Sequence, residues 1–309
     1  MTGRLPRILV LGDLMTDVVA LASGPMSRGN DTRARVRVSG GGSAANTVAW
    51  LAATGVPGAY VGRAGDDLLG RAAVAELRDL GVDVHVGLDP KRATGACVVV
   101  VTPDGERSMF PDAGANAGLA PEHLPPQLFV AGHHLHLSGY ALLTEGSRAA
   151  ALAALALART AGMTISVDPA SVDPLRAVGV ERVMGWLDGV DVLLANENEA
   201  CLLAGLADPL AAGRALTQWF PAVVVKLGGD GAAWCGRDAG APVVVPAVPV
   251  DVVDTTGAGD AFAAGFLPAD LAGAAPADAL TAGCAIAARV VTRAGARPPT
   301  PTALLAQTP

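Results

Sequence analysis

Short buried-strand patterns alternate with helical patterns along most of this 309-residue chain. Strand patterns, which are short apolar runs, occur at residues 8–12, 59–62, 134–137, 164–168, 190–194 and 222–227. Helical patterns fall between them at residues 66–80, 146–161 and 258–266. Gly81 and Gly162 stand where the C-terminal caps of two of these helices are expected. This order predicts an α/β fold with a doubly wound, mostly parallel sheet and helices on both faces.

Two segments depart from the alternation. Residues 32–39 alternate Arg33, Arg35 and Arg37 with small apolar residues, a period of two that indicates a half-exposed strand. Residues 95–102 and 107–110 flank Pro-Asp-Gly at 103–105, which is a hairpin signal. We therefore expect a small antiparallel β flap, or lid, built from about 13–40 and 94–113. It would lie beside the main sheet of a single domain that spans residues 1–309.

Charge and cysteine content narrow the possible partners. The formal net charge of −7 argues against a general nucleic-acid or anionic-membrane surface, because both favour a basic face. Cys97, Cys201, Cys235 and Cys284 are far apart, which predicts reduced structural thiols rather than a zinc site. No secretory signal is visible, and the Ala/Leu run at 149–158 is too short to cross a bilayer. These features predict a cytoplasmic protein.

The sharpest local feature is the string D-T-T-G-A-G-D at residues 254–260, which runs into an apolar helical stretch. A glycine-rich turn at a helix start leaves several backbone N–H groups without partners inside the helix. Together with the helix dipole, these groups form an anion pocket suited to a phosphoryl group in transfer. A carboxylate at the same end, Asp260, is suited to taking a proton from an alcohol. An Asp that only caps the helix is the alternative, which the full seven-residue string disfavours.

Four motifs together give a resemblance to a known family. The 254–260 string resembles the C-terminal signature of the ribokinase-like (PfkB) carbohydrate kinases, and G-G-G-S-A-A-N at 40–46 resembles the N-terminal one. N-E-N-E at 196–199 is similar to the family's N-x-x-E motif, and K-L-G-G-D-G at 226–231 to its nucleotide loop. The four occur in the family's order and spacing over nearly the whole chain. The resemblance implies an ATP-dependent kinase that phosphorylates a hydroxyl of a sugar or sugar-like molecule.

The resemblance also implies a role for individual residues. Asp260 would be the catalytic base, with an anion hole from the amides of Gly257, Ala258 and Gly259. The sugar or nucleoside acceptor would be bound by Asp17, Gly41, Gly42, Asn46, Asn116 and Tyr140. The nucleotide cleft would be lined by Asn196, Lys226, Gly228, Gly231 and Gly283. Relatives commonly carry a small polar residue in place of Lys226.

Two cation sites are implied as well. Mg²⁺ would be organised by Asn196 and Glu199, largely through water, which suits an ion that keeps much of its hydration shell. A monovalent cation, expected to be K⁺, would lie beside the anion hole. Its ligands would come from Asp254, Thr256 and the backbone carbonyls near Val290, Arg293 and Gly295. Pro299 stands about where a serine often completes this shell in relatives.

Several residues differ from those of ribokinases at places expected to contact the acceptor. Met15, Ser43 and Ser138 stand at or near places where ribokinases carry Asn, Lys and Glu. Each change removes an amide or charged contact to hydroxyls, so ribose becomes a poorer fit. A less hydroxylated sugar, a ketose, or a nucleoside whose base packs on Met15 and Tyr140 is favoured. Gly283 also replaces an Asn that is frequent near the adenine in relatives.

Three other classes of function stay open. A nucleoside kinase on the same fold is the nearest alternative. A non-catalytic sugar or nucleotide sensor is disfavoured by the intact Asp260 and Glu199. An NAD-binding oxidoreductase would use the Gly-x-Gly-x-x-Ala pattern at 40–45, but the strand before it is half exposed, whereas a dinucleotide-binding first strand is buried.

Two further features carry weaker expectations. His133, His134 and His136 suggest a metal site, but nothing else in the sequence converges on them, so a place at the start of a strand or on the surface is favoured. Relatives often dimerise through the lid, and the apolar stripe at 98–101 is compatible with a homodimer of this kind.

Overall fold

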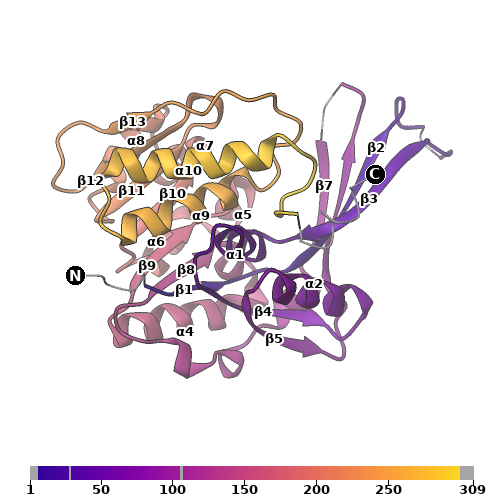
Figure 1. Cartoon of the computed structure of the whole chain (residues 1–309), viewed down its shortest axis with the longest axis horizontal. Coiled ribbons are helices and arrows are strands. Elements are labelled where there is room, and N and C mark those ends of the chain that lie inside the picture. Colours follow the sequence, from indigo (N-terminus) through magenta and orange to yellow (C-terminus); the bar gives the residue numbers. More distant parts are fainter. Residues whose placement is uncertain (1–5, 28, 105–106, 300–309) are drawn as a thin grey trace.

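The computed structural model describes residues 6–27, 29–104 and 107–299, and its body is a nine-stranded sheet (Figure 1). The strand order is β13-β12-β11-β10-β9-β8-β1-β4-β5, with every pair from β11 to β5 parallel and β12 and β13 antiparallel. The strands are β1 (Ile8–Leu11), β4 (Gly58–Gly65), β5 (Asp83–Asp89), β8 (His134–Ser138), β9 (Thr164–Asp168), β10 (Val192–Asn196), β11 (Ala222–Lys226), β12 (Ala232–Gly236) and β13 (Val243–Val245).

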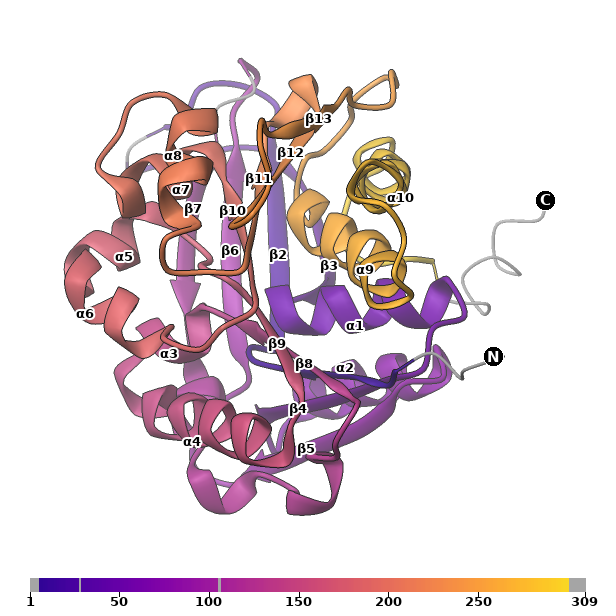
Figure 2. The same ribbon diagram turned by 90° about the vertical axis from the view of Figure 1, so that its left-hand side faces the viewer.

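Helices cover both faces of this sheet, as the doubly wound prediction requires (Figure 2). One face carries α3 (Tyr140–Leu143), α4 (Glu145–Ala161), α5 (Val172–Val178), α6 (Val180–Trp186), α7 (Glu197–Ala204) and α8 (Pro209–Leu216). The other carries α1 (Ser43–Ala53), α2 (Leu68–Asp79), α9 (Ala258–Leu271) and α10 (Pro276–Val291). Successive residues of β1 enter opposite cores, since Leu9 and Leu11 pack on the first face and Ile8 and Val10 on the second. The α/β prediction is confirmed.

The lid is a separate four-stranded sheet with the order β3-β2-β6-β7. Its strands are β2 (Met15–Ala22), β3 (Ala34–Gly41), β6 (Gly95–Val101) and β7 (Arg107–Asp112). The central pair, β2 and β6, is parallel, so the lid is mixed rather than wholly antiparallel as predicted. Both strands leave the body at the same end, since Met15 pairs with Gly95, and they therefore run outward together. The predicted turn includes Gly105, which lies outside the described residues.

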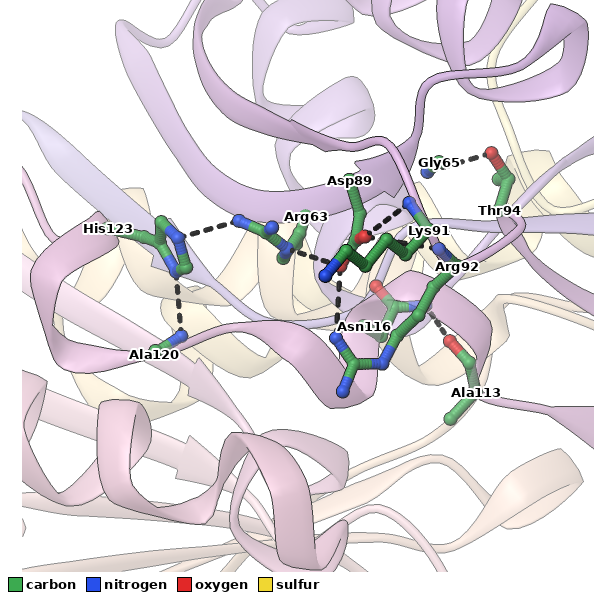
Figure 3. Close-up of polar contacts among 10 residues, drawn as sticks. All are labelled: Arg63, Gly65, Asp89, Lys91, Arg92, Thr94, Ala113, Asn116, Ala120 and His123. Atoms are coloured by element: carbon green, nitrogen blue, oxygen red, sulfur yellow. Dashed lines mark hydrogen bonds and ion pairs between the residues drawn. The ribbon is translucent and has the colours of Figure 1, made fainter.

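The connection from β5 into the lid is fixed by Asp89 at the end of β5 (Figure 3). Its buried carboxylate accepts hydrogen bonds from the backbone N–H groups of Lys91 and Arg92, at 2.9 and 3.1 Å. The guanidinium groups of Arg63 and Arg92 each lie 3.1 Å from its second oxygen. Because Arg63 belongs to β4, this network ties the base of the lid to the main sheet.

The predicted place of the histidine segment at a strand start is confirmed, since His133 precedes β8 and His134 is its first residue, but the alternative of a surface place is wrong for two of the three histidines. His134 and His136 are both 1% exposed, because β8 is a central strand covered on both faces. Their rings hydrogen-bond to the hydroxyls of Thr164 and Ser166 on β9, over 2.7–2.8 Å. Burial lowers the pKa of His134 to about 3 and that of His136 to about 4, so both stay neutral. No cluster of three or more His, Cys, Asp or Glu side chains able to hold a metal occurs in the described part of the chain.

The boundaries of two helices differ from the predicted ones for local reasons. Helix α2 begins at Leu68 because Asp67 caps it, accepting a 2.8 Å hydrogen bond from the Gly70 N–H group. Helix α9 continues past the predicted end to Leu271 and contains Pro268. Among residues 6–299 as described, no helix is both long and apolar enough to cross a membrane.

Candidate active site

A cleft of about 1270 Å³ lies between the lid and the carboxyl ends of the main strands. It is the kind of position where doubly wound sheets bind ligands. Most of the residues predicted for function line it: Asp17, Gly42, Asn46, Asn116, Tyr140, Asn196, Glu199, Lys226, Gly228, Gly231, Thr256, Gly257, Ala258, Gly259 and Asp260. The structure thus brings together segments that are more than 200 residues apart in the sequence.

The predicted phosphate end of the cleft is the start of α9. Gly257 caps this helix with a φ of 77°, a left-handed conformation that favours glycine. A Cβ at Gly257 would also lie 2.6 Å from the side chain of Ala296, so no larger residue fits there. The first-turn N–H groups have no partners within the helix, although that of Ala258 donates to the Thr255 carbonyl at 3.2 Å. This helix start fits the predicted anion hole.

Asp260 lies in the first turn of α9 and faces α1. Its Oδ1 accepts a 2.8 Å hydrogen bond from Ser43 Oγ, and its Oδ2 accepts one of 2.9 Å from Asn46 Nδ2. Burial raises the pKa of Asp260 to about 7, against the opposing effect of these two donors. A carboxylate that titrates near neutral pH is well suited to act as a general base.

Lys226 ends β11 and reaches the same place. Its Nζ lies 2.5 Å from Asp168 Oδ2. A Cβ on Gly259 would lie only 3.1 Å from this Nζ, so the ammonium group stands beside the predicted anion hole. Burial works against the charge of Lys226, but the nearby carboxylates of Asp168 and Glu199 raise its pKa overall. The chain therefore holds a largely covered positive charge in the cleft wall, where phosphoryl oxygens would lie.

Asn196 and Glu199 form a reciprocal cap at the start of α7. Asn196 Oδ1 accepts from the Glu199 N–H group at 2.9 Å, and Glu199 accepts from the Asn196 backbone and side-chain nitrogens at 2.8 and 2.5 Å. Burial raises the pKa of Glu199 to about 7. Both carboxylate oxygens already accept a hydrogen bond, so this pair fits Mg²⁺ that is held through water better than direct ligation.

Asp17 lines the cleft at its predicted acceptor end. Burial, only partly offset by the charge of Arg297, raises its pKa to about 6. Within the described part of the chain, no hydrogen-bond donor reaches this carboxylate. A Cβ on Gly41 would collide with it, which explains why glycine is needed there. A half-buried carboxylate that no protein donor reaches is well placed to accept hydrogen bonds from a ligand rich in hydroxyl groups.

Asn116 lines the cleft but uses its amide within the protein. It lies in the short helix η1 (Gly114–Gly118), where its Oδ1 accepts from the Leu14 N–H group at 2.9 Å. Its Nδ2 donates to the Leu14 carbonyl at 2.9 Å and to the Ala113 carbonyl at 3.0 Å, the second of which is drawn in Figure 3. These contacts give Asn116 a part in shaping the loop before β2. Its contact with an acceptor stays a prediction.

Three side chains in this region were not included in the site predicted from the sequence. Asp13 accepts hydrogen bonds from the Ser43 N–H group and Ser138 Oγ, both at 2.9 Å, and so fixes the start of α1. Asp168 holds Lys226, as described above. Arg297 reaches Asn46 from the C-terminal segment. Asp13 and Asp168 carried one available signal, since each is an acidic residue at or just after the carboxyl end of a predicted strand.

Residues predicted for a monovalent cation lie behind the anion hole, where two segments meet. Asp254 accepts from the backbone and hydroxyl of Thr256, at 2.9 and 2.7 Å, and from the Gly295 N–H group at 3.1 Å. The Arg293 N–H group bonds to the Val290 carbonyl at 3.3 Å. The predicted ligands from the 254–256 and 290–295 segments thus lie in one region, and cation binding there stays a prediction. Away from this place, Gly283 packs on the ring of Phe262, so any contribution to nucleotide binding would be indirect.

Ala170, which follows Asp168 and Pro169 in the cleft wall, has a φ of 78° although it is not glycine. A left-handed conformation costs a residue with a Cβ about 1–2 kcal/mol. We expect Ala170→Gly to stabilise the protein by about 0.5–1 kcal/mol after the larger chain entropy of glycine is allowed for. Urea unfolding would measure this, with Ala156→Gly in α4 as the control, where a loss of about 1 kcal/mol is expected. A destabilised Ala170→Gly protein would contradict the account.

Comparisons with known proteins agree with this geometry. Residues 5–303 match the model of a family described as pfkB family carbohydrate kinase. Fructokinase-1 of Oryza sativa subsp. japonica is 32% identical over 277 residues, which cover 86% of this chain and 84% of that protein. An ATP-dependent ribose-1-phosphate kinase of Halopiger xanaduensis is 35% identical over 267 residues, covering 84% of this chain and 83% of that protein.

Solved structures extend the likeness to the whole fold. The crystal structure of an adenosine kinase from Sinorhizobium meliloti superimposes with a TM-score of 0.86 at 26% sequence identity. The superposition covers 98% of this chain and 99% of that one.

Proposed function

This chain belongs to the pfkB family of carbohydrate kinases and is an ATP-dependent sugar kinase, and from this premise we propose that its acceptor is a ketose such as fructose. The observation that carries the proposal is the half-buried Asp17 carboxylate, which lines the cleft and has no donor within the described part of the chain. Two neighbouring sugar hydroxyls can each donate to one of its oxygens. Met15 and Ser43 line the same cleft and lack the amide and ammonium groups that ribokinases carry at these two positions.

The reaction would run from the lid side of the cleft to the start of α9. Asp17 and Asn46 hold the sugar beneath the lid and present one hydroxyl to Asp260. Asp260 takes the proton from this hydroxyl as its oxygen attacks the γ-phosphoryl group, and ADP leaves. The amides of Gly257 and Gly259, with Lys226 beside them, stabilise the charge on the phosphoryl oxygens. Closure of the lid excludes water and so limits wasteful hydrolysis of ATP.

The nucleotide would lie at the carboxyl ends of β10 and β11, along the 226–231 loop. Asn196 and Glu199 would orient the water shell of Mg²⁺, which neutralises charge on the β- and γ-phosphates when it is bound. K⁺ beside Asp254 and Thr256 would hold the 254–256 and 290–295 segments together. That would keep the helix start of the anion hole in place.

An acceptor screen by coupled ADP release tests the proposed function. We expect kcat/KM for fructose to exceed that for ribose by about tenfold or more, because one lost hydrogen-bonding group in a polar site costs at least this much. 2-Keto-3-deoxygluconate and ribose 1-phosphate complete the set of sugars in the screen. The variant Asp17→Asn should lower kcat/KM for every sugar and leave KM for ATP near its wild-type value. A clear preference for ribose would refute the assignment.

A nucleoside acceptor is the second candidate, favoured by the apolar part of the cleft. Cys97, Val99, Met109 and Pro111 lie on the same lid sheet as Asp17, and they line the cleft together with Tyr140 of α3. Such a surface can pack against a flat base. In the same screen, a kcat/KM for adenosine above that for every sugar would show that the acceptor is a nucleoside.

The outer face of the lid supports a homodimer. Val38, Val18, Val98 and Phe110 pair across the four strands, and Val38, Val98 and Phe110 are 62%, 39% and 61% exposed. An apolar row of this kind on an exposed sheet favours association with a second copy. The double variant Val38→Lys/Phe110→Lys should then sediment as a monomer while wild type sediments as a dimer, and a monomeric wild type would contradict this.

The four free cysteines and the use of ATP suit a cytoplasmic location.

A further inference from the structure

We propose that Arg297 is a positioning residue for the catalytic base, because its guanidinium group fixes the Asn46 amide in the orientation that donates to Asp260. The proposal rests on the proposed role of Asp260 as the base. It concerns a residue of the C-terminal segment that no sequence motif indicated and that does not itself touch Asp260.

The guanidinium group of Arg297 is held on all sides. Its side chain is only 4% exposed. Nε donates to Asn46 Oδ1 at 3.3 Å, Nη1 to Glu76 Oε2 at 2.6 Å, and Nη2 to the Gly41 carbonyl at 2.7 Å. These acceptors belong to α1, α2 and the end of β3. Three directional contacts from three elements leave this planar group one position.

The orientation of Asn46 follows from this arrangement. A side-chain amide has an accepting oxygen and a donating nitrogen, and only one of them can face a given neighbour. Arg297 is a pure donor, so Oδ1 of Asn46 must face it, and Nδ2 is turned towards Asp260 Oδ2 at 2.9 Å. A flipped amide would set two donors against each other at Arg297 and two acceptors against each other at Asp260.

The backbone around Arg297 is anchored as firmly as its side chain. The Ala296 carbonyl accepts a 2.8 Å hydrogen bond from Trp50 Nε1, and the Arg297 carbonyl accepts one of 3.1 Å from Arg293 Nη2. At Gly40 a Cβ would collide with the guanidinium group, so the lid strand needs a glycine to pass over it. Arg297 is therefore a fixed reference point against which the amide of Asn46 is set.

The donor from Asn46 keeps Asp260 in the form that can accept a proton. Hydrogen bonds from Asn46 and Ser43 lower the pKa of Asp260, which burial and the carboxylates of Asp168 and Asp13 raise. The ammonium of Lys226 is the charged group of opposite sign nearby. If Asn46 no longer donates, protonated Asp260 is favoured, and the acid limb of the kcat/KM profile should move to higher pH.

A double-mutant cycle tests the proposal on the full chain. We expect Arg297→Met to lower kcat about tenfold or more and to move the acid limb of kcat/KM to higher pH, since a hydrogen bond to a charged group is lost. In an Asn46→Ala background the same substitution should have little further effect on either quantity. Glu76→Gln is the matched control. Its side-chain oxygen still accepts from Arg297, so its pH profile should follow wild type.

Several results would overturn the idea. Additive effects of Arg297→Met and Asn46→Ala, an unmoved acid limb, or an equal shift in Glu76→Gln would each show that Arg297 acts only on the structure. Should Arg297→Met not fold, Arg297→Lys and Arg297→Gln run the same cycle. Asp260→Asn separates the two proposals. Normal turnover there would remove the base itself, whereas an inactive Asp260→Asn enzyme with additive effects at Arg297 would remove only this inference.

Discussion

Asp260→Asn is expected to lower kcat by about 10²- to 10⁴-fold while acceptor affinity stays close to that of wild type. An amide has nearly the same shape as the carboxylate but cannot take the proton from the attacking hydroxyl. Stopped-flow or coupled ADP release gives kcat, and calorimetry gives the dissociation constant of the sugar. Turnover within a few-fold of wild type would remove Asp260 from the mechanism.

Asp270→Asn is the matched control, because it makes the same chemical change near the other end of α9. It should leave kcat unchanged. Folding of the Asp260→Asn protein can be checked at pH 8. Burial raises the pKa of Asp260 to about 7, so the folded protein favours the protonated carboxyl group. That contribution to the stability of the fold is present at low pH and is lost as the pH rises through about 7. The ionised carboxylate then costs stability in wild type, and the variant should melt at no lower temperature.

Lys226→Met is expected to lower kcat by about 10²- to 10³-fold and to raise KM for ATP. The ammonium group stands beside Gly259 at the start of α9, where negative charge builds up on the phosphoryl oxygens during transfer. Methionine keeps much of the length and packing of lysine without the charge. Single-turnover kinetics with saturating ATP separates the chemical step from nucleotide binding.

Loss of Lys226 also leaves Asp168 buried without its partner, which can cost about 3–5 kcal/mol of stability. Lys226→Met/Asp168→Asn removes the stranded charge and serves as the control. We expect this double variant to regain thermal stability but not turnover. If turnover returns together with stability, Lys226 would have only a structural part.

Local sequence was enough to predict what depends on local structure. The start of α9, with Gly257 in a left-handed conformation and Asp260 in the first turn, follows from seven consecutive residues. Glycine caps at Gly81 and Gly162 were predicted for the same reason, and both have a positive φ. Glu199 shows the limit of such patterns, because the same four residues can mark either a helix start or a ligand site. In the structure Glu199 both forms a capping bond with Asn196 and lines the cleft.

Contacts between distant segments could not be predicted in this way. Arg297 meets Asn46 across about 250 positions of sequence, and Lys226 meets Asp168 across 58. Neither pair has a spacing that a sequence pattern could indicate. The parallel pairing of β2 with β6 was missed because it depends on where both strands leave the body. The burial of His134 and His136 depends on the position of β8 in the strand order, where it lies between β9 and β1.

The way the lid is attached has a consequence for how the protein can vary. All four lid strands meet the body at one end, where Met15 pairs with Gly41 and Gly95, and Ala96 with Asp112. In the part of the chain that the structure describes, the far ends lead into the connections after Ala22 and Val101 (Figure 1). We expect loops that grow or shrink at this outer rim to leave the cleft undisturbed, because they lie at the ends of the lid strands away from the body. This rim is therefore where an affinity tag or a fluorescent label can be inserted without loss of turnover.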